Sequence, residues 1–208
     1  MDFHEGCAED DSMSVVTLVS GGLDSTVMAA LVRQEGVTQY PLFVNYGQLN
    51  LKREWNACVQ NFRKHGLPRP QKMDLGGFGN TVKSGLTSKK LDAVIDAFLP
   101  TRNLLFLICG AAVAQKNNAD AVLIGLLSER THLFPDQTDQ FLELARKAIA
   151  ESLGRPMEIR APLRQFMKQD VVQLAEKMRI RGTYSCHRGG ARPCRTCIAC
   201  REFVVGTT

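Results

Sequence analysis

The chain lacks any apolar run long enough to cross a membrane. No stretch of its 208 residues approaches the roughly 20 consecutive apolar residues that a transmembrane helix needs, and the N-terminus lacks the basic and then apolar pattern of a secretory signal. The net charge is only +5, which suits an anionic substrate but does not require nucleic acid, so direct nucleic-acid binding is not expected. These absences predict a cytoplasmic protein without a membrane partner.

The sequence also shows no internal repeat, and we expect no second domain. A chain of 208 residues that is 44% hydrophobic can bury a substantial single core. Residues 1–13 are acidic and polar, and we expect them to form a flexible leader. Residues 14–208 are expected to form one domain that includes a small metal-binding segment over 183–203. The sequence leaves open whether this domain forms a homodimer.

The glycine-rich turn after the first apolar run lacks the lysine of a Walker motif. Residues 15–19 predict a buried parallel strand, and a helix is expected from Asp24 onward, so backbone N–H groups would converge on an anion. The intervening letters SGGLDS resemble the signature of the PP-loop ATP pyrophosphatases, which hold the β- and γ-phosphates of ATP as a leaving pyrophosphate. An ordinary glycine-rich turn is the alternative. The residues expected to bind ATP are Val19, Ser20, Gly21, Gly22, Leu23, Asp24, Ser25 and Thr26.

Apolar strands and amphipathic helices alternate along the rest of the chain. Strands are expected over 40–46, 71–75, 121–125 and 157–163, and helices over 50–65, 104–115 and 165–178. Such alternation predicts right-handed crossovers and a doubly wound parallel α/β sheet. Asn103 is expected to cap the helix over 104–115. Residues 76–88 are rich in Gly, Ser, Thr and Lys and predict a mobile surface loop.

Seven cysteines would suggest disulfides in a small secreted protein, but four of them are spaced as metal ligands. Cys186, Cys194, Cys197 and Cys200 follow the pattern C-x7-C-x2-C-x2-C. Four thiolates so close together can enclose a structural Zn²⁺ tetrahedrally, and nearby arginines would offset their charge. Free thiols or disulfides are the alternative. The segment has few apolar residues and would need the metal to fold.

Several short motifs together resemble the 7-cyano-7-deazaguanine synthase, or QueC, family. They are the SGG-x-DS loop, the Tyr46-Gly47-Gln48 triplet after the second strand, Pro100 with Arg102 and Asn103 before an apolar helix, and the C-terminal cysteine cluster. The resemblance extends from Val15 to Phe203. The loop and the cysteine segment together carry it, because each remaining motif alone is weak.

The resemblance implies an ATP-dependent C–N ligase. Members of the family adenylate the carboxylate of 7-carboxy-7-deazaguanine, let ammonia form the amide, and use a second ATP to dehydrate the amide to the nitrile, a precursor of queuosine. Mg²⁺ would bridge the departing pyrophosphate. The residues to which the resemblance gives catalytic roles are Asp24, Arg102, Asn103, Asp136 and Lys168, the last as an electrostatic clamp.

The chain departs from the family pattern after the second strand. The family has Arg-His after the Gln, whereas here Leu49 and Asn50 follow Gln48. Arg53 stands at the position of a family Glu, and Glu54 is next to it.

A second departure leaves the substrate's acceptor open. Within 130–138 only Pro135 and Asp136 match the loop that borders the deazaguanine pocket in the family. QueC-like relatives in antiphage defence clusters attach a deazaguanine to a protein amine, so a protein acceptor is one alternative. A PP-loop tRNA-modifying enzyme would normally need a nucleophilic cysteine near ATP, but Cys58 and Cys109 are expected to be buried in helices. A zinc-ribbon binding module with an inactive SGGLDS loop is a third alternative, after the protein acceptor and the tRNA-modifying enzyme.

Overall fold

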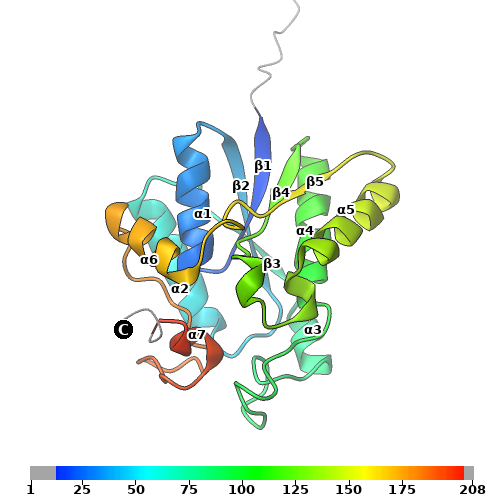
Figure 1. The fold of residues 1–208 in the computed structure, drawn as a ribbon. Helices are drawn as coiled ribbons and strands as arrows, with labels where there is room; N and C mark the ends of the chain where they lie inside the picture. The colour runs from blue at the N-terminus through cyan, green and yellow to red at the C-terminus, as the bar shows by residue number, and fades with distance from the viewer. Residues whose placement is uncertain (1–12, 204–208) are drawn as a thin grey trace, which may run out of the picture.

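The structure, a computed structural model, describes residues 13–203 and consists of a parallel sheet between two layers of helices (Figure 1). Five strands pair in the order β3-β2-β1-β4-β5, and every pairing is parallel. The strands are β1 (Ser14–Val19), β2 (Thr38–Asn45), β3 (Gln71–Asp74), β4 (Ala121–Leu123) and β5 (Glu158–Arg160). The helices are α1 (Leu23–Gln34), α2 (Leu51–Lys64), α3 (Gly76–Thr81), α4 (Arg102–Lys116), α5 (Asp139–Leu153), α6 (Lys168–Lys177) and α7 (Ile198–Arg201), with 3₁₀ turns η1 (Glu129–Thr131) and η2 (Pro135–Gln137). The predicted doubly wound α/β sheet is confirmed.

Both faces of the sheet are buried, which explains why its central strands are continuous apolar runs. Val16 and Leu18 pack on the side of α4 and α5. Val15 packs on the opposite side with α1 and α6, and Phe43 packs there with α1 and α2. Helices α1 and α6 lie on one side of the sheet in Figure 1, and α4 and α5 lie on the other.

Strand β1 lies where the strand order reverses. It pairs with β2 on one side and with β4 on the other. Ligands of doubly wound sheets bind beyond the carboxyl ends of the strands at such a point. The turn over 20–25 follows β1, and Gly125 follows β4, so these two segments mark the candidate site.

Residues 76–88 are not the mobile surface loop that their composition predicts. Residues 76–81 form α3, and Leu86 is only 3% exposed. The backbone of this segment is tied to distant residues, because Leu49 N donates to Leu86 O over 2.9 Å and Gly85 N donates to Asp96 O over 2.7 Å. Such long-range partners are invisible in local composition.

Helix α4 begins earlier than predicted, and Asn103 is not its N-cap. Thr101 holds the cap position with a left-handed φ of 62°, and Asn103 lies in the first turn. Asp136 supplies the missing acceptor from 33 residues away, since its Oδ2 accepts from Asn103 N over 3.3 Å. Asn103 Nδ2 in turn donates to Asp136 O over 3.0 Å.

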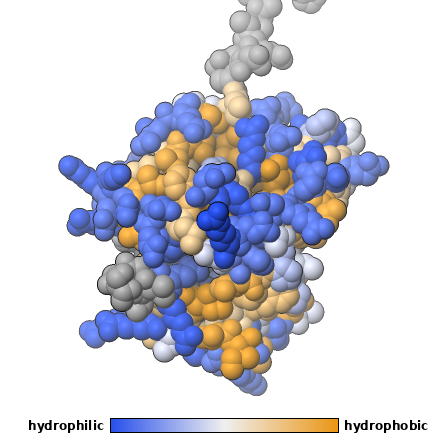
Figure 2. All heavy atoms as spheres, in the orientation of Figure 1, coloured by the Kyte–Doolittle hydropathy of each residue, from blue (hydrophilic) through white to orange (hydrophobic). Residues whose placement is uncertain are grey.

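The predicted leader over 1–13 lies, apart from Met13, outside the described residues. Within residues 13–203, no helix has both the length and the apolarity needed to cross a membrane. Hydrophilic side chains cover much of the face shown in Figure 2, and hydrophobic ones gather in its lower part.

Candidate active site

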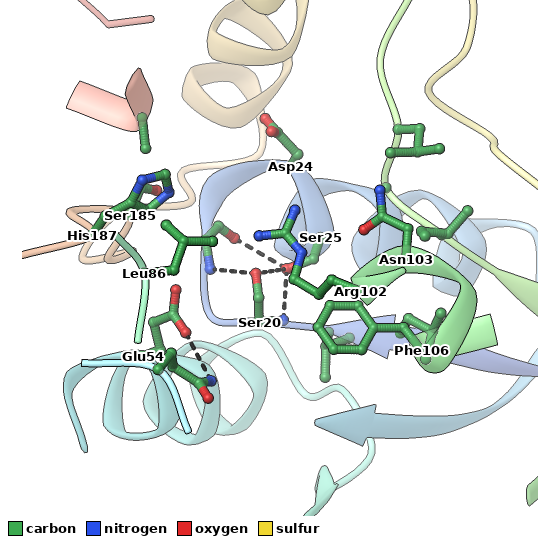
Figure 3. A pocket seen from close by; sticks show the side chains of 18 of the residues that line it. Ser20, Asp24, Ser25, Glu54, Leu86, Arg102, Asn103, Phe106, Ser185 and His187 are labelled. Atoms are coloured by element: carbon green, nitrogen blue, oxygen red, sulfur yellow. Dashed lines mark hydrogen bonds between the residues drawn. The ribbon is translucent and has the colours of Figure 1, made fainter. Parts of the chain in front are cut away.

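The SGGLDS turn forms a compact loop in front of α1. Ser20 N donates to Ser25 Oγ over 3.1 Å, and the two serine hydroxyls lie 3.2 Å apart (Figure 3). Thr26 Oγ1 donates to Gly22 O over 2.8 Å and closes the first helical turn. No side chain caps the N-terminus of α1, so its N–H groups remain available to an anion.

Close packing against α2 leaves no room for a side chain at Gly21 of this loop. Gly21 has a φ of +78°, and a Cβ built on it would lie 2.2 Å from the backbone carbonyl oxygen of Glu54 in α2. A Cβ on Gly125 would be in ordinary contact with the loop, 3.4 Å from Ser25 N. Gly21 therefore allows the loop to lie directly against α2, and the end of β4 lies next to the loop on the other side.

A cavity of about 280 Å³ opens over the loop at the carboxyl ends of the strands. Most of the residues predicted for the site line it: Val19, Ser20, Gly22, Leu23, Asp24, Ser25, Arg102, Asn103 and Lys168. Gly21, Thr26 and Asp136 are not among its lining residues, and they act on it indirectly. Gly21 and Thr26 shape the loop, and Asp136 holds the first turn of α4.

Lys168 joins the SGGLDS loop to the C-terminal segment. Its Nζ donates to the two carboxylate oxygens of Asp24 over 2.8 and 3.0 Å, and lies 3.2 Å from Glu202 Oε2. Burial raises the pKa of the Glu202 carboxyl, and the neighbouring Lys168 opposes this effect. Glu202 is a residue of this site that the sequence motifs did not reveal.

Arg102 enters the cavity from the first turn of α4. Its guanidinium carbon lies 5.9 Å from the ring centroids of both Tyr46 and Phe106, so both rings make cation–π contacts with the guanidinium. Arg102 Nε is buried without a hydrogen-bond partner among the described residues. The guanidinium is thus positioned by packing, and its Nε–H can still donate a hydrogen bond to a ligand.

Glu54 is a second charged residue of the cavity that sequence reasoning did not identify. Its Oε1 accepts from Asn50 Nδ2 over 2.9 Å, and its Oε2 accepts from Gln48 Nε2 over 3.2 Å. Burial raises the pKa of the carboxyl to about 7, although both hydrogen bonds act in the opposite direction. Arg53 points elsewhere, because its Nε donates to Gly189 O over 3.0 Å.

The four predicted metal ligands converge. The Sγ atoms of Cys186, Cys194, Cys197 and Cys200 all lie within 4.8 Å of one another. A tetrahedral site with Zn–S bonds of about 2.3 Å requires sulfur atoms about 3.8 Å apart, and Cys194 Sγ lies 3.9 Å from Cys200 Sγ. None of the six described cysteines forms a disulfide. The donor set therefore fits a tetrahedral metal ion.

The cysteine segment also forms a wall of the cavity. Tyr184 N donates to Gly21 O over 3.0 Å, and Asn50 Nδ2 donates to the carbonyl oxygen of Cys186 over 3.1 Å. Ser185 and His187 line the cavity next to the loop (Figure 3). Burial, with the nearby charge of Arg102, lowers the pKa of His187 to about 4.

The parallel sheet, the SGGLDS loop at its switch point and the cavity above define a nucleotide-binding α/β protein of the PP-loop ATP pyrophosphatase type. Solved structures share this fold. The U34-tRNA thiolase NcsA from Methanococcus maripaludis aligns with a TM-score of 0.55 at 19% identity, covering 93% of this chain and 64% of that one. NMN synthetase from Francisella tularensis aligns with a TM-score of 0.54 at 14% identity, covering 88% and 71%. Such low identities show the fold alone.

The chain belongs to the QueC family, because the family model described as queuosine biosynthesis protein QueC matches residues 14–205. Relatives named 7-cyano-7-deazaguanine synthase include one from Nautilia profundicola that is 32% identical, over 92% of this chain and 91% of the relative. Another, from Sulfurovum sp., is 30% identical over 89% of each. The family predicted from the motifs is confirmed.

Proposed function

We propose that the protein is an ATP-dependent 7-cyano-7-deazaguanine synthase, which converts 7-carboxy-7-deazaguanine and ammonia into the nitrile. The observation that carries this is one cavity in which an uncapped helix start, Lys168 and the unpartnered Arg102 all converge. Family membership and the names of the relatives point to the same reaction. The four free thiols favour a reducing compartment, and we place the protein in the cytoplasm.

The first half of the reaction is adenylation. A carboxylate is a poor electrophile because its oxygen does not leave, and attack of that oxygen on the α-phosphorus of ATP makes it part of AMP. The new P–O bond forms as the bond to pyrophosphate breaks. The N–H groups at the start of α1 would hold the β- and γ-phosphates, with Lys168 offsetting their charge. Asp24 and Glu202 are the carboxylates that could hold Mg²⁺, which neutralises the pyrophosphate when bound.

The second half is substitution and dehydration. Ammonia attacks the acyl carbon, AMP departs with the former carboxylate oxygen, and loss of a proton from the nitrogen gives the amide. The amide oxygen then attacks a second ATP, which releases pyrophosphate and one proton, and loss of AMP and the second proton gives the nitrile. We assign Arg102 to the oxygen that is adenylated in each round, because its guanidinium is in the cavity and its Nε has no partner in the described part of the chain.

We assign Zn²⁺ to the four cysteines as a structural ion. All four ligand positions of a tetrahedral ion would be occupied by protein, so no position remains for a substrate. The ion would hold the segment that carries Ser185 and His187 against the ATP loop.

Mass spectrometry after incubation with 7-carboxy-7-deazaguanine, Mg-ATP and ammonium tests the proposal. The expected products are the amide and then the nitrile, with one pyrophosphate released for each AMP. A matched incubation of Lys168→Gln should release pyrophosphate about 100-fold more slowly, as expected when a group that stabilises transition-state charge is lost. Absence of pyrophosphate release from the wild-type protein would refute the proposal. An adduct on an added protein, with no amide formed, would replace ammonia by a protein amine as the acceptor.

A further inference from the structure

Glu54 is a half-buried acid of the cavity that the adenylation steps leave without a role. It lines the cavity from α2, and Figure 3 shows its carboxylate beside Leu86 and near Ser20. The hydrogen bonds from Gln48 and Asn50 fix the orientation of the carboxylate. No lysine or arginine forms an ion pair with it among the residues that the structure describes.

Arg102 is the complementary group in the same cavity. It bears a positive charge, it is supported by the rings of Tyr46 and Phe106, and no described carboxylate forms an ion pair with it. Opposite charges in one cavity would normally pair with each other. Here each is held by its own neighbours instead, so the space between them is prepared for a ligand that presents an acceptor to Arg102 and donors to Glu54.

The walls of this space suit a flat ring. Tyr46, Leu86 and Phe106 line it, and Leu86 and Tyr46 are almost fully buried. The pyrimidinone edge of a 7-deazaguanine carries a carbonyl oxygen, an N1–H and a 2-amino group in a row. Its two donors match a carboxylate, because each carboxylate oxygen retains a lone pair after accepting one hydrogen bond. The carbonyl oxygen is an acceptor for a guanidinium, and it lies on the same edge of the bicycle as the 7-carboxyl oxygen assigned to Arg102, so one guanidinium can donate to both.

We propose that Glu54 determines specificity for the deazaguanine by accepting hydrogen bonds from its N1–H and 2-amino groups. This inference rests on the proposed function, since it assumes a deazaguanine substrate. It also gives a physical meaning to the departure after β2. Arg53, which stands at the position of the family's Glu, faces the cysteine segment, and Glu54 supplies the carboxylate that enters the cavity.

Calorimetric binding of two ligands tests this assignment. The first ligand is 7-carboxy-7-deazaguanine, and the second is its analogue without the 2-amino group. The wild-type protein should bind the first about 10- to 100-fold more tightly, because the analogue leaves the half-buried carboxylate of Glu54 without a charge-assisted hydrogen bond. Glu54→Gln should bring the two affinities close together. Glu151→Gln makes the same chemical change at an exposed position of α5 and should preserve the wild-type ratio.

Each outcome supports or overturns the assignment. A Glu54→Gln variant that keeps the wild-type ratio would overturn it. A Glu54→Gln variant that binds a non-hydrolysable ATP analogue more weakly, but binds the deazaguanine as the wild type does, would also overturn it. That result would assign Glu54 to the adenine ring. If Glu54→Gln does not fold, Glu54→Asp retains the charge but shortens its reach, and it must also lose the discrimination. A wild-type protein that binds neither deazaguanine would refute the proposed function itself.

Discussion

Replacing Gly21 by alanine should force the SGGLDS loop away from helix α2. Gly21 has a φ of +78°, and its added Cβ would lie 2.2 Å from Glu54 O and 2.9 Å from Cys58 N. Both neighbours are backbone atoms of a helix, so no side-chain rotation can relieve the overlap. The loop or the helix must shift as a whole.

The loss of stability in Gly21→Ala is the sum of two separate costs. A left-handed backbone conformation costs an alanine about 1–2 kcal/mol, and overpacking against fixed atoms costs about 1–3 kcal/mol more. Gly36 isolates the first term, because it has a φ of +73° and nothing within 4 Å of its added Cβ. We therefore expect Gly36→Ala to lower the free energy of unfolding by about 1–2 kcal/mol and Gly21→Ala by about 2–5 kcal/mol.

Urea unfolding of both variants, with ATP-analogue binding measured below the transition, provides the assay. Gly36→Ala should bind the nucleotide as the wild type does, since its change is strain at the end of α1, whereas Gly21→Ala should lose nucleotide affinity as well as stability. Equal destabilisation of the two variants, with nucleotide affinity kept in both, would refute the argument that close contact with α2 positions the loop.

Four further changes are open to test. Asp24→Ala should slow pyrophosphate release by about 100-fold or more with little change in melting temperature, because it removes the charge that orients Lys168; unchanged turnover would contradict the assigned role. Cys197→Ser should lower the metal content measured by elemental analysis and destabilise the segment over 183–203; bound metal in full amount would refute this ligand set. Burial raises the pKa of Glu54 to about 7 from 4.5, so the folded form binds this proton more tightly than the unfolded one. Stability should therefore fall as the pH rises from about 4.5 to 7, and Glu54→Gln should remove that slope in urea titrations. Asp136→Ala should cost about 1 kcal/mol by thermal unfolding, because it leaves the start of α4 without its distant cap.

The parts of the site that are local in sequence could be predicted from sequence. A strand, a glycine turn and a helix start are contiguous over 15–26, and their geometry follows from residue type alone. The cysteine segment is similar, because four ligands within fifteen residues can reach one centre in few ways. In both cases the chemistry is encoded by neighbours along the chain.

The parts of the site that depend on distant partners could not be predicted from the sequence. Asn103 has the composition of an N-cap, but Thr101 takes the cap position and Asp136 supplies the acceptor from another loop. Leu86 lies in a polar segment and is nevertheless buried, since it packs against Tyr46 and Leu99. Glu54 was missed for a related reason. Adjacent residues of a helix point about 100° apart, and only the structure shows that this residue, rather than Arg53, faces the cavity.

The cysteine segment and the SGGLDS loop hold each other in position. The segment over 184–202 contains one four-residue helix, α7, and few apolar side chains, so packing alone offers little to keep it in place. Its contacts with the cavity residues are nevertheless specific, because Tyr184 N donates to Gly21 O and Glu202 is paired with Lys168. A bound metal would fix the backbone while leaving these side chains free to be chosen for ligand binding rather than for a core. We therefore expect a structural metal in this family to influence nucleotide affinity without touching the nucleotide.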